Sequence, residues 1–113
     1  MKTKEDKRKH PRIDVIWPVK MDIKGETING ETSNIATEGI SIVCSKPLPI
    51  DEIVYISLEP QDQEPIDFYG KIVWSDVYGI DQEDIAHGLG ICFVQIARKD
   101  RKRYNDLVGL LVR

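Results

Sequence analysis

A strict alternation of apolar and polar residues from position 13 to position 23 constrains this fold more than any other feature. The apolar set is Ile13, Val15, Trp17, Val19, Met21 and Ile23, and Asp14, Lys20 and Asp22 lie between its members. Successive side chains of a strand point to opposite faces, so this period predicts a strand with one buried face. Pro18 lies on the outward set, where its missing N–H confines it to an edge or a bulge.

Five further segments have strand character, and turn signals separate them. They run from about Thr27 to Ile35, Ile40 to Cys44, Ile53 to Leu58, Ile66 to Ser75 and Gly88 to Ile96. Gly90, inside the last segment, indicates a bulge or a close backbone approach. Short strands in series predict a six-stranded antiparallel β-barrel, closed or split.

The period changes at the end of the chain. Tyr104, Leu107, Val108 and Leu111 have the i, i+3, i+4, i+7 spacing of one apolar helix face. This stripe predicts a helix that packs over a barrel opening, with a partner-binding helix as the alternative. We therefore expect one all-β domain with a single C-terminal helix: a flexible basic arm over 1–12, a barrel over 13–97 and the helix over 98–113.

The charge balance limits the classes of partner. With 16 Lys and Arg against 19 Asp and Glu, the formal net charge is −3, which argues against a general nucleic-acid binder. Basic residues gather at both ends: Lys2, Lys4, Lys7, Arg8, Lys9 and Arg12, then Arg98, Lys99, Arg101, Lys102 and Arg103. Weak RNA or DNA binding through these clusters is an alternative function. No stretch has the length and composition of a signal peptide or membrane span, so we expect a cytoplasmic protein without membrane insertion.

Residue types that carry catalysis or bind metals have no supporting arrangement. Cys44 and Cys92 lie far apart in apolar contexts and are predicted to be buried free thiols. His87 has no Cys, Asp or Glu at metal-ligand spacing. There is no P-loop and no Ser/His/Asp or Cys/His pattern, so no catalytic residue, metal site or enzyme activity is expected. Trp17 and Trp74 fall on the alternating apolar sets and are predicted to pack in the core, with base stacking as the alternative.

Two arginines, Arg8 and Arg12, stand just before the first alternation. A guanidinium carries five donors in a planar fork, so it can grip a phosphate or the O6/N7 edge of guanine bidentately. Guanine nucleotides are therefore the first ligands to consider, with a solvated basic tail as the alternative. Lys7 and Lys9 could balance a second, stacked ligand molecule, and His10 could contact a phosphate or a base; solvated side chains are the alternative for all three.

A second polar group lies at the turn after the second predicted strand. Asn34 offers an amide able to hydrogen-bond a base edge, and Gly39 permits either positive φ or close approach of a ligand to the backbone. Taken alone, this segment is an ordinary turn.

Together the two groups resemble the PilZ domain family of bacterial cyclic di-GMP receptors. Its signature is RxxxR followed by [D/N]xSxxG, and Arg8, Arg12, Asn34 and Gly39 match it by position. The segments 70–74 and 88–93 look like the family's later strands, so the resemblance covers nearly the whole chain. It implies that the arginines contact the phosphates and guanines of the ligand and that the second motif adds polar contacts. The implied ligand site comprises Arg8, Arg12, Asn34, Ala36 and Gly39, with no cofactor besides cyclic di-GMP.

Ala36 departs from the pattern, which has Ser at that position. Losing a hydroxyl removes a neutral hydrogen bond worth about 0.5–1.5 kcal/mol, whereas a charge-assisted contact is worth about 1.5–3 kcal/mol. The departure thus predicts a weakened site more readily than a dead one.

The resemblance implies a receptor whose N-terminal arm becomes ordered on ligand binding and signals to an unidentified downstream protein. Pro11 would lower the cost of ordering the arm by fixing its own φ and biasing His10 toward an extended form. The alternative is a degenerate PilZ domain that acts as a nucleotide-independent adaptor for protein interactions.

Overall fold

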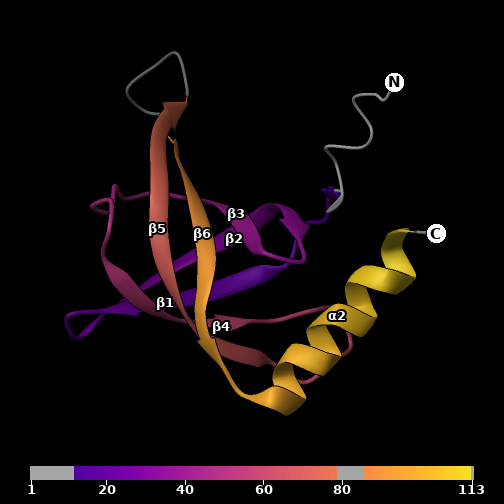
Figure 1. Ribbon diagram of the computed structural model, residues 1–113. Coiled ribbons are helices and arrows are strands. Elements are labelled where there is room, and N and C mark those ends of the chain that lie inside the picture. The colour runs from indigo at the N-terminus through magenta and orange to yellow at the C-terminus, as the bar shows by residue number, and fades with distance from the viewer. Residues whose placement is uncertain (1–11, 79–85, 113) are drawn as a thin grey trace, which may run out of the picture.

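The computed structural model describes residues 12–78 and 86–112, in which six antiparallel strands close a barrel and one helix follows (Figure 1). The elements are β1 (Pro18–Ile23), β2 (Glu26–Ala36), β3 (Gly39–Cys44), β4 (Ile53–Leu58), β5 (Ile66–Tyr78), β6 (Ala86–Ile96) and α2 (Arg98–Val112). Around the barrel the strand order is β1-β2-β3-β6-β5-β4. This confirms the predicted fold class. β5 and β6 are longer than predicted and extend beyond the other strands (Figure 1).

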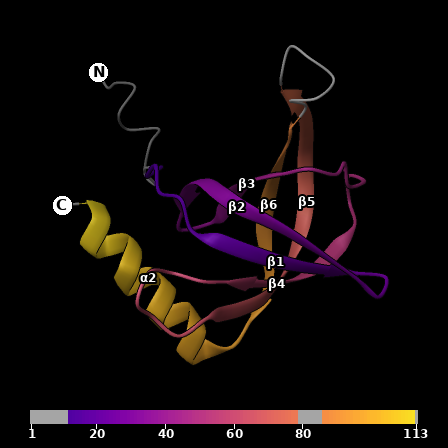
Figure 2. The ribbon, with the colours of Figure 1, turned by 180° about the vertical axis from the view of Figure 1, so that it is seen from behind.

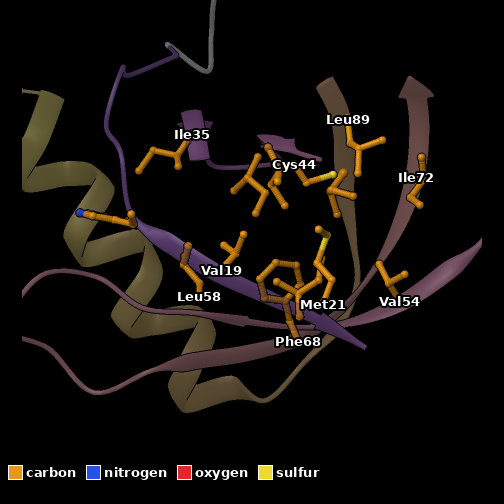
Figure 3. Close-up of a cluster of buried hydrophobic side chains, with 14 of the residues drawn as sticks. Val19, Met21, Ile35, Cys44, Val54, Leu58, Phe68, Ile72 and Leu89 are labelled. Carbon is orange, nitrogen blue, oxygen red and sulfur yellow. The ribbon is translucent and has the colours of Figure 1, made fainter. Parts of the chain in front are cut away.

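Every strand contributes apolar side chains to the barrel interior, and Figure 3 shows part of this cluster. In β1, burial alternates as the sequence predicted: Val19, Met21 and Ile23 are buried, while Lys20 and Asp22 are exposed. Removing such side chains from water is the main favourable term in folding.

The first strand, β1, is shorter than the alternation over 13–23 predicted. Ladder pairing with β2 begins at Pro18, and the preceding segment meets β2 through one isolated bridge, between Ile13 and Ile35. The cause is a one-residue bulge in that segment, because four residues, 14–17, lie opposite only three residues of β2, 32–34. Ser33 of β2 is likewise an extra residue toward β3, between the pairs made by Thr32 and Asn34. Such a bulge interrupts the ladder. The Thr32 hydroxyl bridges part of the gap, since it accepts the Trp17 N–H at 2.9 Å and donates to the Val15 carbonyl.

The two tryptophans have different environments. Trp17 is buried, as predicted, but Trp74 is 36% exposed, so the prediction of core packing for Trp74 was wrong. A bulge in β5 explains the difference: Ile72 pairs with Ile91 and Trp74 with Gly90, which leaves Val73 as an extra residue. After this bulge the alternation is out of phase, and Trp74 lies on the outer face of the barrel.

Both cysteines are free thiols, as predicted, but only Cys44 is fully buried. Cys92 is partly exposed because it lies on the outward set of β6, opposite Gly39 of β3. The prediction of burial was therefore wrong for Cys92.

Helix α2 packs against one end of the barrel (Figure 2). Tyr104 and Val108 are buried, and the Tyr104 ring meets Phe93 edge-on with centroids 5.0 Å apart. The predicted stripe fails at Leu111, which is 42% exposed because the last turn of α2 extends past the barrel. Across 12–78 and 86–112, no helix has the length and apolarity needed to cross a membrane.

Candidate functional site

One row of residues crosses four neighbouring strands on the outer face of the barrel. Asn34 of β2 pairs with Ser41 of β3, Ser41 pairs with Gly90 of β6, and Gly90 pairs with Trp74 of β5. The adjacent inward row is Ile35, Ile40, Ile91 and Ile72, all buried. Since neighbouring residues of a strand alternate between faces, the polar and aromatic row points outward.

This row forms the floor of a cavity of about 170 Å³. Its lining comprises Arg12, Asn34, Ala36, Glu38, Gly39, Ile40, Ser41, Val73, Trp74, Gly90, Ile91 and Cys92. Four residues of the site predicted from the sequence are thus brought together: Arg12, Asn34, Ala36 and Gly39. The other candidates, Arg8, Lys7, Lys9 and His10, lie outside the described residues, as does the rest of the predicted arm up to residue 11.

Larger hollows elsewhere on the barrel are chemically different. One of about 510 Å³ is lined by Ile16, Trp17, Pro18, Glu59, Pro60, Gln61, Gln63 and Pro65, and one of about 560 Å³ by Asp14, Val15, Ile16, Glu31, Thr32, Ser33 and Val43. Each of these linings contains carboxylate and no Lys or Arg. A third hollow, of about 500 Å³, holds Lys99 and Arg103 beside Glu64, Asp67 and Asp100. None of the three combines a guanidinium with a side-chain amide and an indole, as the lining of the candidate cavity does.

Arg12 is held next to Asn34 by main-chain hydrogen bonds of the residues that follow each of them. Ile13 N–H donates to the Ile35 carbonyl at 2.8 Å, and Ile35 N–H donates to the Ile13 carbonyl at 2.8 Å. Arg12 itself is exposed. A guanidinium and a primary amide therefore reach one cavity from segments that are more than twenty residues apart in the sequence.

Gly39 is required by the packing of two strands. A Cβ at this position would lie 2.2 Å from the Ile91 carbonyl oxygen of β6, a distance that real Cβ atoms do not reach. Positive φ is not the reason, because Gly25 is the glycine with positive φ among the described residues. Of the two roles considered for Gly39, close approach is the correct one, but the group that approaches is the β6 backbone.

Trp74 is a site residue for which the sequence reasoning favoured core packing and kept base stacking only as the alternative. Its indole lies against the backbone of Gly90, where a Cβ would come within 2.0 Å of Trp74 Nε1. The close approach predicted at Gly90 is thus confirmed, although the approaching group is a side chain. An aromatic ring fixed beside a guanidinium and an amide can stack on a planar base. Gly90 was the available signal, since the bulge that turns Trp74 outward leaves no mark in the sequence.

Ser41 was also missed. It is only 5% exposed, lines the cavity, and lies directly opposite Asn34 across the β2–β3 pair. The alternation of β3 contained the signal, because Ile40 and Ile42 point inward and Ser41 must therefore point outward. A hydroxyl is thus present in the cavity wall, although position 36 of the motif supplies only a methyl group.

Besides the Glu38 carboxylate, the described lining combines one guanidinium, one amide, one hydroxyl and one indole, which suits a flat ligand with hydrogen-bonding edges and a group that Arg12 can grip. Arg12 and Glu38 are the charged members of the lining. Among the residues that the structure describes, no group of three or more His, Cys, Asp and Glu side chains is placed to hold a metal ion.

Comparison with solved structures finds the same fold in proteins of low sequence identity. The PilZ domain of YcgR from Escherichia coli, solved with cyclic di-GMP, has a TM-score of 0.77 at 13% identity, over 94% of this chain and 92% of that one. The complex of K. pneumonia MrkH with cyclic di-GMP has a TM-score of 0.81 at 16% identity, over 93% of this chain and 52% of that one. MotI of Bacillus subtilis, an inhibitor of motility, has a TM-score of 0.71 at 18% identity, over 94% and 50%.

This chain spans about half the length of MrkH and MotI. A search of curated protein sequences gave no match. The sequence model of the PilZ domain matches residues 6–110, which is nearly the whole chain. The chain therefore belongs to the PilZ domain family.

Proposed function

We propose that this chain is a receptor for cyclic di-GMP. The observation that carries the proposal is the convergence of Arg12, Asn34, Ser41 and Trp74 on one outward cavity. Arg8 precedes Arg12 by four residues in the sequence and adds a second guanidinium to the same end of the chain. Family membership supports the proposal, as do the solved relatives YcgR and MrkH, which are described with cyclic di-GMP.

Each residue has a role that follows from its chemistry. The ligand carries two phosphates and two guanines, so the arginines grip phosphate oxygens or guanine edges through charge-assisted hydrogen bonds. Asn34 meets a base edge from the barrel surface, and Trp74 stacks on a base. Lys7, Lys9 and His10 remain candidate contacts from the arm.

The size of the cavity makes the arm necessary. About 170 Å³ is well below the roughly 300–1,000 Å³ of pockets that enclose drug-sized ligands, so the barrel alone covers only part of the nucleotide. We propose that the segment bearing Arg8 closes over the remainder. Ordering a residue costs about 1–2 kcal/mol. The bridge between Ile13 and Ile35 lowers this cost, because the chain is already fixed immediately after Arg12.

Ala36 is the observation that favours the second candidate, a nucleotide-independent adaptor. The hydroxyl of the family pattern is absent there, and the methyl group is 6% exposed in the cavity wall. Ser41 argues against this alternative, since its hydroxyl lies on the same face, opposite Asn34. We therefore propose a receptor of reduced affinity, acting in the cytoplasm, whose closed arm is read by a partner protein.

Calorimetric titration with cyclic di-GMP tests the receptor. Wild-type protein is expected to bind saturably, and Arg8→Ala and Arg12→Ala are each expected to abolish binding. Lys20→Ala is the matched control, because it removes one exposed positive charge from β1, on the other side of the barrel. Binding by this control within twofold of wild type shows that net charge is not the cause. Absence of heat from the wild type at tens of micromolar ligand would leave the adaptor as the better account.

A further inference from the structure

The turn that follows Asn34 is anchored by the C-terminal helix. The buried Tyr104 hydroxyl of α2 donates a hydrogen bond to the Ala36 carbonyl at 2.5 Å and lies 3.4 Å from the Gly39 carbonyl. These two carbonyls begin and end the turn between β2 and β3. One hydroxyl from the helix thus contacts both ends of the segment that forms the candidate site.

A second residue of the same helix holds the middle of the turn. Arg101 Nη1 donates to the Thr37 carbonyl at 2.8 Å, and the guanidinium carbon lies 4.5 Å from the centre of the Phe93 ring. Phe93 N–H in turn donates to the Glu38 carbonyl at 3.4 Å. All four carbonyls from Ala36 to Gly39 therefore lie within reach of a donor on α2 or β6.

Burial keeps the anchoring hydroxyl protonated. Desolvation is the main cause that raises the pKa of Tyr104 above its ordinary value of 10.0, so the hydroxyl remains a donor throughout the neutral range. Tyr104 also packs on Phe93, which fixes the direction of its ring. The donor is therefore rigid, and the turn is held in one conformation only while the helix is docked.

We propose that Tyr104 and Arg101 are positioning residues for the nucleotide site, so that docking of α2 and affinity for cyclic di-GMP are thermodynamically coupled. The inference rests on the receptor proposed above. Neither side chain has to touch the ligand, because each acts through the carbonyls of the turn next to Asn34. Coupling between two sites is reciprocal, so ligand that stabilises the turn also stabilises the docked helix.

Tyr104→Phe is the sharpest perturbation, since it keeps the ring and removes only the hydroxyl. A neutral hydrogen bond corresponds to about a three- to tenfold change in affinity, which is the expected weakening of cyclic di-GMP binding. In the unliganded variant, hydrogen exchange of the amides of residues 37–39 is expected to be faster than in wild type. In wild type, ligand is expected to slow exchange in 98–112, and this protection is expected to shrink in Tyr104→Phe.

Two arginines of α2 allow a matched comparison of variants. This comparison remains available even if Tyr104→Phe fails to fold. Arg101→Met removes the bond to Thr37 and the charge over Phe93. Arg103→Met removes the bonds to the Pro65 and Glu64 carbonyls and to the Asp100 carboxylate, none of which belongs to the turn. Each variant loses one charge and loosens the helix. Only Arg101→Met is expected to weaken binding, by about tenfold or more because its bond is charge-assisted, and to speed exchange in the turn.

Three results separate the possible accounts. Equal weakening by Arg101→Met and Arg103→Met would overturn the inference, because general helix anchoring would then explain both. Unchanged exchange of the turn and binding within twofold of wild type in Tyr104→Phe would overturn it as well. Failure of the wild type to bind would refute the receptor itself, whereas the exchange measurement on unliganded protein would still report whether Tyr104 positions the turn.

Discussion

Gly90→Ala is a one-carbon substitution aimed at the wall of the cavity. The added Cβ would lie 2.0 Å from Trp74 Nε1 and 2.4 Å from Cδ1 and Cε2, so the indole must move away. Trp74 is on the outer face and partly exposed, so it has room to move without disturbing the inward row. The substitution therefore displaces the ring that we assign to base stacking while the barrel stays closed.

The expected losses of stability and of affinity follow from the contacts that the Trp74 ring would lose. Trp74 is 36% exposed, so about two-thirds of its surface is covered. A tryptophan buries about 150–250 Å² when fully enclosed, and at about 25 cal/mol per Å² the covered part is worth at most about 4 kcal/mol. This is the upper bound on the loss of unfolding free energy, and partial repacking should leave a loss of about 1–2 kcal/mol. Stacking on a base contributes about 1–3 kcal/mol, so affinity should fall roughly tenfold or more.

The assay combines denaturant unfolding with calorimetric titration of cyclic di-GMP. Fluorescence in a Trp17→Phe background reports on Trp74 alone and verifies that the ring has moved. Gly109→Ala is the control, since nothing lies within 4 Å of its added Cβ on α2. It should leave binding unchanged and raise stability slightly, because Ala is the better helix former. Wild-type affinity in Gly90→Ala, with an altered Trp74 emission, would refute the stacking role.

Three further outcomes are expected. Ala36→Ser restores the hydroxyl of the family pattern and should tighten cyclic di-GMP binding by up to about tenfold in calorimetry; a weaker complex would mean that the cavity has no acceptor or donor for it. Ser41→Ala should weaken binding about three- to tenfold in the same titration, and an unchanged affinity would remove Ser41 from the site. Burial raises the pKa of Tyr104 above 10.0, so its contribution to stability is complete below pH 10 and is lost as pH rises further, by about 1.4 kcal/mol per pH unit. Denaturant unfolding between pH 8 and about 11 should show this decline, and an equally steep decline in Tyr104→Phe would contradict the assignment.

The sequence was sufficient for the elements and their class, because period-two alternation and turn residues are local signals. It failed at the bulges of β2 and β5. An extra residue at Ser33 or Val73 leaves composition and hydrophobicity unchanged, yet it shifts the phase of every side chain that follows. The burial predicted for Trp74 was wrong for this reason. The short ladder of β1 has a similar origin, since residues 14–17 contain one residue more than the part of β2 opposite them.

The site likewise contains residues that the sequence indicated and contacts that it could not indicate. Arg12 and Asn34 were recognisable as a pair only through a family pattern, since their proximity depends on the bridge between Ile13 and Ile35. The contact from Tyr104 to the Ala36 carbonyl spans 68 positions and engages a backbone atom, which no side-chain pattern encodes. Tyr104 was correctly predicted as a buried helix residue, but its hydroxyl gave no local sign of its partner.

The most direct test of the receptor is a two-dimensional NMR titration of the wild-type protein with cyclic di-GMP. The proposal predicts saturable shifts at the amides of Asn34, Ser41 and Gly90, which belong to the row beneath the cavity. The amides of Lys20 and Ser57, paired on the β1–β4 side of the barrel, should not move. The absence of saturable shifts, or shifts confined to the β1–β4 side, would contradict the proposed receptor site.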